Sequence, residues 1–170
     1  ITETPSKEYY LNATIQIDGM GVYGDYIGTT EVKGRGNSTW GLPKKPYRLK
    51  LTEKASLCGF AKAKNYVLLA NYLDPTLMLN AVTFKAARLL ELPFTNHTVP
   101  VDVTLNGIYK GSYMLTEQVE VKANRVDLDE DNCILWELDT NFDEDLRFRS
   151  DYFELPVMVK DPDLSAEQFE

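Results

Sequence analysis

The sequence contains few residues that could hold a metal ion or cross-link the fold. It has one histidine, His97, and two cysteines, Cys58 and Cys133, among 170 residues. Their spacing matches no structural zinc site, because such sites take four Cys or His ligands at regular intervals. We therefore expect no zinc and a structural role for His97. The two cysteines could pair in one disulfide, but we favour two free thiols.

Long apolar runs and an excess of positive charge are also absent. No run approaches the roughly 20 apolar residues of a membrane-spanning helix. The formal net charge of -8 argues against nucleic acids and anionic membranes as partners, since both attract basic surfaces. With 44% hydrophobic and 26% charged residues, the composition is that of an ordinary globular domain. A phosphate-bearing ligand would need a local group of cations.

Such a group is present in residues 34–50. It begins with a loop that contains two glycines, Gly34 and Gly36, which allow tight turns and bring backbone N–H groups close to an anion. A predicted strand follows, and Arg48 and Lys50 share one face of it because they are two residues apart. The sequence thus predicts a polyphosphate-binding corner. The residues assigned to it are Gly34, Arg35, Gly36, Asn37, Ser38, Thr39, Arg48 and Lys50.

This pattern has an alternative interpretation. The two glycines lack the third glycine of the dinucleotide-binding fingerprint, and the loop does not match the P-loop spacing. A structural hairpin turn followed by a solvated basic strand therefore remains open on these residues alone.

Alternating and continuous apolar segments predict a mostly antiparallel sheet. The expected strands cover residues 9–17, 27–33, 46–51, 66–70, 133–138 and 153–160. A further hairpin over 99–119 turns at Asn106-Gly107, a dipeptide typical of tight β-turns.

One main helix is expected between the fourth strand and this hairpin. Asp74 before Pro75 suits an N-cap, and the helix should end before Pro93. Its apolar stripe is expected in the core and consists of Leu77, Ala81, Phe84, Ala87 and Leu90. Strands with one helix indicate the α+β class.

The last residues suggest that the domain continues. Residues 165–168 have the spacing of a capping box, which predicts the start of a helix. We therefore expect residues 1–170 to form a single domain fragment, the N-terminal portion of a longer domain.

Four motifs in order resemble the spore coat protein H (CotH) kinase family. They are Gly34-Arg-Gly-Asn-Ser-Thr-Trp, Pro43-Lys-Lys-Pro-Tyr-Arg-Leu-Lys, Asn65-Tyr-Val-Leu-Leu-Ala-Asn-Tyr with Asp74, and Leu105-Asn-Gly-Ile-Tyr-Lys-Gly-Ser-Tyr-Met-Leu-Thr-Glu-Gln-Val-Glu. The similarity spans about residues 9–162. It implies an extracellular or cell-surface protein that binds ATP and Mg²⁺ and phosphorylates a protein substrate. The implied fold is the small lobe of an atypical protein-kinase-like structure.

The resemblance also implies roles for individual residues. The backbone of residues 34–39 would cover the phosphates, and Lys50 would pair with them, with Arg35 and Arg48 as second choices. The segment that begins at Glu117 would meet the adenine.

Two positions depart from the kinase pattern. The helix carries Lys85 and Arg88 where kinases place a glutamate, so Glu117 or Glu137 is expected to pair with Lys50 instead. Leu79 stands where the family has an arginine before Asn80. The catalytic and metal-binding aspartates of the family lie beyond the last residue, so no catalytic residue is assigned here.

A second function remains open on the sequence. The chain could be a catalytically inactive binding or adhesion module on a kinase-like scaffold, as the departure at Leu79 and the many aromatic residues would allow. Its partner, like the protein substrate of a kinase, is unknown. A purely structural domain is the third alternative.

Overall fold

A computed structural model describes residues 5–129, 132–141, 144–162, 164–165 and 167. The chain divides into two compact units, Ile1–Gln118 and Val119–Glu170. The first unit contains β1 (Leu11–Ile17), β2 (Tyr26–Gly34), a 3₁₀ turn η1 (Ser38–Gly41), β3 (Tyr47–Ala55), β4 (Ala63–Leu69), α1 (Leu79–Leu89), β5 (Thr98–Leu105) and β6 (Ile108–Glu117).

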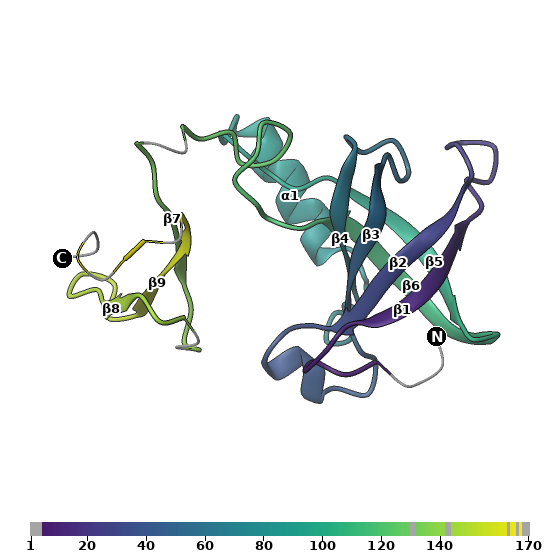
Figure 1. The fold of residues 1–170 in the computed structure, drawn as a ribbon, viewed down its shortest axis with the longest axis horizontal. Helices are drawn as coiled ribbons and strands as arrows, with labels where there is room; N and C mark the ends of the chain where they lie inside the picture. Colours follow the sequence, from purple (N-terminus) through teal and green to yellow (C-terminus); the bar gives the residue numbers. More distant parts are fainter. Residues whose placement is uncertain (1–4, 130–131, 142–143, 163, 166, 168–170) are drawn as a thin grey trace. The chain divides into compact units, whose positions relative to one another are not determined.

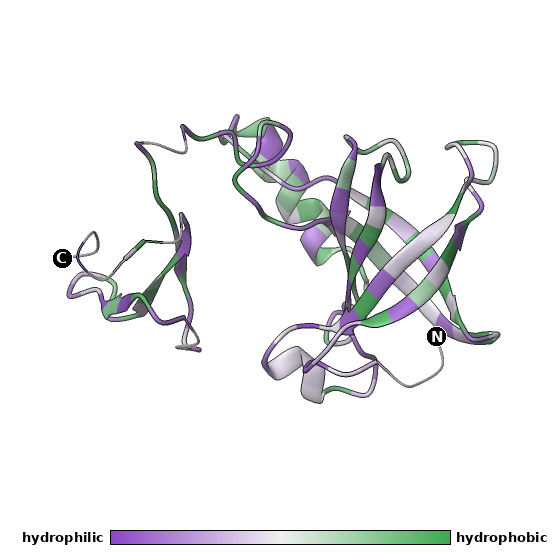
Figure 2. Ribbon diagram, in the orientation of Figure 1, coloured by the Kyte–Doolittle hydropathy of each residue, from purple (hydrophilic) through white to green (hydrophobic). Residues whose placement is uncertain are grey.

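The six strands of the first unit form one antiparallel sheet in the order β1-β2-β3-β4-β6-β5. The sheet curls into a half-barrel (Figure 1). Hydrophobic and hydrophilic residues alternate along its strands (Figure 2), so one face is apolar. The side chains packed on that face include Val32, Tyr47, Leu49, Leu51, Tyr66, Leu68, Tyr113 and Leu115.

The strand predictions for this unit are confirmed, with small changes at the ends. The hairpin turns at Asn106 and Gly107, whose φ angles of 50° and 77° suit this turn. β3 and β4 are longer than expected, because their polar ends, 52–55 and 63–65, remain in the sheet. Polar residues at a strand end carry no apolar alternation, so the sequence does not signal them.

The helix differs from its prediction in position and burial. It begins at Leu79, five residues after Asp74, because Leu77 has a positive φ of 58° that interrupts helical geometry. None of its residues is buried, so the predicted core stripe is wrong. The sheet forms the core of the unit by curling on itself, and the helix is not needed as a second layer.

The expected fold class is therefore wrong. The structure is a mostly antiparallel β protein with a curled half-barrel sheet, and not the α+β small lobe of a kinase that the resemblance implies. An eleven-residue helix that buries no side chain does not make a helical layer. The sequence predicted the helix and the main strands, but it could not show that the helix buries no side chain.

The second unit contains a three-stranded antiparallel sheet in the order β7-β9-β8. Its strands are β7 (Leu135–Leu138), β8 (Arg147–Arg149) and β9 (Pro156–Asp161). β7 and β9 confirm the last two predicted strands, whereas β8 was not predicted because three residues, two of them arginine, give no strand signal. Val157, Met158 and Val159 of the central strand are buried.

Three smaller predictions concern the two cysteines, the last residues of the chain and membrane-spanning helices. Cys58 and Cys133 are both free, as favoured. The predicted helix start at 165–168 includes residues 166 and 168, which lie outside the described residues. Within the described part of the chain, no helix is long and apolar enough to cross a membrane.

Candidate functional site

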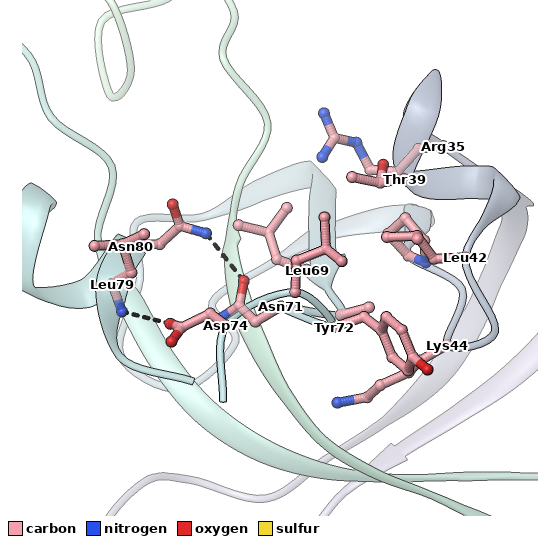
Figure 3. A pocket seen from close by; sticks show the side chains of 13 residues that line it. Arg35, Thr39, Leu42, Lys44, Leu69, Asn71, Tyr72, Asp74, Leu79 and Asn80 are labelled. Atoms are coloured by element: carbon pink, nitrogen blue, oxygen red, sulfur yellow. Dashed lines mark hydrogen bonds between the residues drawn. The ribbon is translucent and has the colours of Figure 1, made fainter. Parts of the chain in front are cut away.

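A pocket of about 250 Å³ lies between the connection from β2 to β3 and the connection from β4 to α1. Three of the four motifs that the sequence singled out therefore meet at one place. The lining residues are Arg35, Thr39, Leu42, Lys44, Pro46, Leu69, Ala70, Asn71, Tyr72, Leu73, Asp74, Leu79 and Asn80. Figure 3 shows that Arg35 and Thr39 face the pocket from one side and Asp74, Leu79 and Asn80 from the other.

The loop of residues 34–39 reaches the pocket through a tight turn at Gly36. Its φ is +80°, and a Cβ atom there would lie 2.1 Å from the Thr39 hydroxyl oxygen. Any larger residue would therefore be strained and would push Thr39 away. The glycine lets the chain turn so that Arg35 and Thr39 line the same pocket.

The backbone of this loop offers several hydrogen-bond donors. The N–H of Gly34 donates to the Ser6 carbonyl and that of Arg35 to the Pro46 carbonyl. Within the described chain, the N–H groups of residues 36–39 donate no hydrogen bond. Such groups are common where a helical turn begins. Here they stand beside a basic side chain, an arrangement that suits an anion.

Lys44, near the end of the β2–β3 connection, contacts β6. Its ammonium donates to the Ser112 carbonyl and lies 4.5 Å from the centre of the Tyr113 ring. The Tyr113 hydroxyl in turn donates to the Lys45 carbonyl over 2.9 Å. Burial lowers the pKa of Lys44, because a desolvated ammonium is less stable than a hydrated one. An anion in the pocket would offset this loss of hydration.

The opposite wall is a polar network at the start of α1. The Asp74 carboxylate accepts hydrogen bonds from the Leu79 N–H at 2.7 Å and from the Thr76 N–H and hydroxyl. These bonds lower the pKa of Asp74, the Thr76 hydroxyl contributing most. The Asn80 amide donates to the Asn71 side-chain oxygen over 2.9 Å (Figure 3). The Asp74 carboxylate is thus already hydrogen-bonded to backbone and side-chain groups that stabilise the start of the helix.

Arg48 lies next to this pocket, on the face of the sheet opposite the core. It pairs with Val67 on β4, and Leu69, two residues further along the same strand and face, lines the pocket. The Nε atom of Arg48 is buried and has no hydrogen-bond partner among the described residues. An unsatisfied buried guanidinium nitrogen is unfavourable, so a ligand oxygen there would remove a cost.

The other predicted site residues lie elsewhere. Lys50 does not line the pocket, since its ammonium is 3.1 Å from the Glu31 carboxylate and 5.5 Å from the centre of the Tyr10 ring. The sequence predicts Glu117 or Glu137 as its partner, but the register of β2 and β3 places Glu31 directly opposite it.

The two glutamates have partners of their own. The buried carboxylate of Glu117 accepts the backbone N–H of His97 at 2.6 Å and lies 2.9 Å from the ring Nδ1 of the same residue. This contact gives His97 the structural role expected from the sequence. Glu137 pairs with Lys160 at 3.2 Å inside the second unit. Neither pairs with Lys50.

Sequence reasoning did not assign the other polar residues of the pocket. They are Lys44, Asn71, Asp74 and Asn80. Their signal was present, because three of them stand in the motifs that carry the family resemblance. They were interpreted as motif or capping residues, since a sequence does not show that the two connections face each other.

The negative charge of the chain belongs mainly to the second unit. Val119–Glu170 contains sixteen Asp and Glu against five Lys and Arg, a formal charge of -11, whereas Ile1–Gln118 contains ten against thirteen, a charge of +3. The unit that carries the pocket is therefore mildly basic. The net charge of the whole chain does not argue against an anionic ligand at this site.

The described residues fit a phosphate group better than a metal ion. No group of three or more His, Cys, Asp or Glu in the described ranges could hold a metal. The donors of the loop and the unpaired Nε of Arg48 are both suited to anionic oxygens.

Comparison with known families gives the identity of the chain. The family described as CotH kinase protein matches residues 32–162. The chain belongs to the CotH kinase family. No curated protein matches the sequence. The match includes the β2–β3 connection, the pocket and most of the second unit, and it confirms the resemblance drawn from the four motifs.

Proposed function

We propose that this member of the CotH kinase family contributes the nucleotide-binding part of a protein kinase, in which the 34–39 loop and its pocket hold the phosphates of ATP. The observation that carries the proposal is the pocket lined by Arg35, Thr39 and Lys44, in a loop whose N–H groups at residues 36–39 donate no hydrogen bond within the described chain. Phosphoryl transfer relies on positioning and electrostatic stabilisation, and these are the interactions that such groups supply.

The residues would divide the binding between them. The N–H groups of residues 36–39 would donate hydrogen bonds to phosphate oxygens, and the Arg35 guanidinium would neutralise their charge. Arg48, which lies next to the pocket, would donate its unpaired Nε–H to an oxygen further along the phosphate chain. Bound ATP would supply the phosphoryl group. The described residues offer no Mg²⁺ site, so the proposal assigns no metal ligand. The extracellular or cell-surface location implied by the resemblance is part of the same proposal.

A calorimetric titration of the chain with ATP tests the proposal. Arg35→Ala should weaken binding about tenfold or more, which corresponds to about 1.4 kcal/mol, the size expected for one charge-assisted hydrogen bond. Lys50→Ala is the matched control, because it removes one positive charge from the same unit but lies outside the pocket. Absence of ATP binding, or equal losses in both variants, would contradict the proposal.

An inactive binding module is the second candidate, favoured by exposed aromatic side chains in the second unit. Trp136 and Phe153 are each 56% exposed and Tyr152 is 87% exposed. Exposed aromatic residues commonly mark recognition surfaces. A chain that binds no nucleotide but loses attachment to its partner in a Trp136→Ala variant would support this candidate over the kinase.

A further inference from the structure

The two edges of the six-stranded sheet differ in their protection against further strand pairing. β5, at one edge, contains Pro100 and the charged Asp102. Both residue types discourage the addition of another strand. β1, at the other edge, has the sequence Leu-Asn-Ala-Thr-Ile-Gln-Ile, with no charge, proline or glycine. Natural proteins rarely leave such an edge without a partner.

β1 pairs with a neighbouring strand along one side only. All seven residues pair with β2, from Leu11 opposite Val32 to Ile17 opposite Tyr26. No other strand in the described ranges pairs with β1. An antiparallel strand directs about half of its N–H and C=O groups to each side. The outer half of these groups therefore lacks a strand partner.

The side chains of β1 also suggest that its packing is incomplete. Ala13, Ile15 and Ile17 pack against the core, yet each is only partly buried. The alternate residues, Asn12, Thr14 and Gln16, are exposed. A strand added at this edge would cover more of the apolar row and would pair with the polar row on the other face.

We propose that β1 pairs with β1 of a second copy of this chain, antiparallel and centred on Thr14. This register is self-complementary, as a two-fold interface requires. It places Leu11 opposite Ile17, Asn12 opposite Gln16, Ala13 opposite Ile15 and Thr14 opposite its own copy. Apolar residues meet apolar residues on one face and polar residues meet polar residues on the other, with no charge in the row.

A second copy is favoured over an unrelated strand because the fit follows from β1 itself. A register shifted by one residue would place the apolar row of one strand opposite the polar row of the other. The Asn12–Gln16 pairs would add side-chain hydrogen bonds on the exposed face. The proposal does not depend on nucleotide binding, because no residue of β1 lines the pocket.

The test is the mass of the chain in solution at increasing concentration, measured by light scattering or sedimentation. The unmodified chain should dimerise. Thr14→Lys and Thr14→Glu should each weaken the dimer about tenfold or more, because each places two like charges directly opposite each other. An equimolar mixture of the two variants should recover the dimer, since opposite charges then meet across the axis. Thr14 is exposed, so both variants should fold.

Thr104→Lys is the matched control, because Thr104 is an exposed threonine on the opposite edge strand. It should leave the dimer unchanged. A chain that stays monomeric at every concentration overturns the proposal, even if it binds an extended peptide of another protein. A dimer that tolerates Thr14→Lys, or that Thr104→Lys weakens equally, overturns it as well.

Discussion

The ring of Trp40 lies directly against the backbone of Gly34. A methyl group on Gly34 would fall 2.4 Å from two carbon atoms of the ring. Lys45 also contacts the tryptophan, since its ammonium donates to the Trp40 carbonyl over 2.6 Å and lies 5.3 Å from the ring centre. The glycine and the tryptophan of the first motif are therefore one packing unit that positions the loop between them.

This contact predicts the effect of Gly34→Ala. The added methyl group has no space, so either the ring or the strand must move, and overpacking of this kind costs about 1–3 kcal/mol of unfolding free energy. Urea denaturation measures the loss. Gly41→Ala is the matched control, because a Cβ atom there meets no atom within 4 Å, and it should change stability little. A double variant, Gly34→Ala with Trp40→Leu, should recover part of the loss. Equal stability of the two alanine variants would contradict the account.

A second prediction concerns alkaline pH. Burial, with a further contribution from neighbouring Tyr47, raises the pKa of Tyr113 from 10.0 to about 12. The unfolded chain therefore releases this proton first, and the stability that Tyr113 contributes is complete below pH 10 and is lost as the pH rises through about 12.

Tyr113→Phe should accordingly flatten the fall of unfolding free energy with pH over this window. It also removes the hydrogen bond to Lys45, which only the protonated hydroxyl can donate, so this loss lowers the unfolding free energy below pH 10 and contributes to the flattening. The burial of Tyr47 raises its pKa too, so some slope should remain. The exposed Tyr152 serves as the control in a Tyr152→Phe variant. An unchanged slope in Tyr113→Phe would show that the hydroxyl is not desolvated.

The third prediction concerns the contact between Glu117 and His97. Glu117→Ala leaves the backbone N–H of His97 without its acceptor, and an unsatisfied donor of this kind costs about 1–3 kcal/mol. His97→Ala keeps that hydrogen bond and removes only a ring that is 61% exposed. Its cost in urea denaturation should therefore be clearly smaller. Equal losses would mean that the ring contact, rather than the backbone bond, stabilises this end of β6.

The strands could be predicted from the sequence because alternation of apolar residues reports which side faces the core. The boundaries of α1 could not, since the positive φ of Leu77 depends on the turn that Asp74 and Thr76 form. Its apolar spacing indicated a buried face. The curled sheet forms the core by itself, and no residue of the helix is buried.

The sequence pointed to the 34–39 loop, from which Arg35 and Thr39 line the pocket, but it selected Lys50 rather than Lys44. Arg48 and Lys50 share a face, yet Lys50 lies about 6–7 Å further along the strand, in the row of Glu31. Only the strand register decides which cation lies next to the pocket. Lys44 was missed because its partners on β6 are 68 residues away in sequence.

Backbone amide NMR during a titration with ATP would report which residues the nucleotide contacts. If the 34–39 loop holds the phosphates, the N–H signals of residues 36–39 should show saturable shifts, together with those of residues 69–74 across the pocket. These shifts should be much reduced in Arg35→Ala and retained in Lys50→Ala. Shifts confined to the strand row of Glu31 and Lys50, to the second unit, or to no residue at all would contradict the proposal.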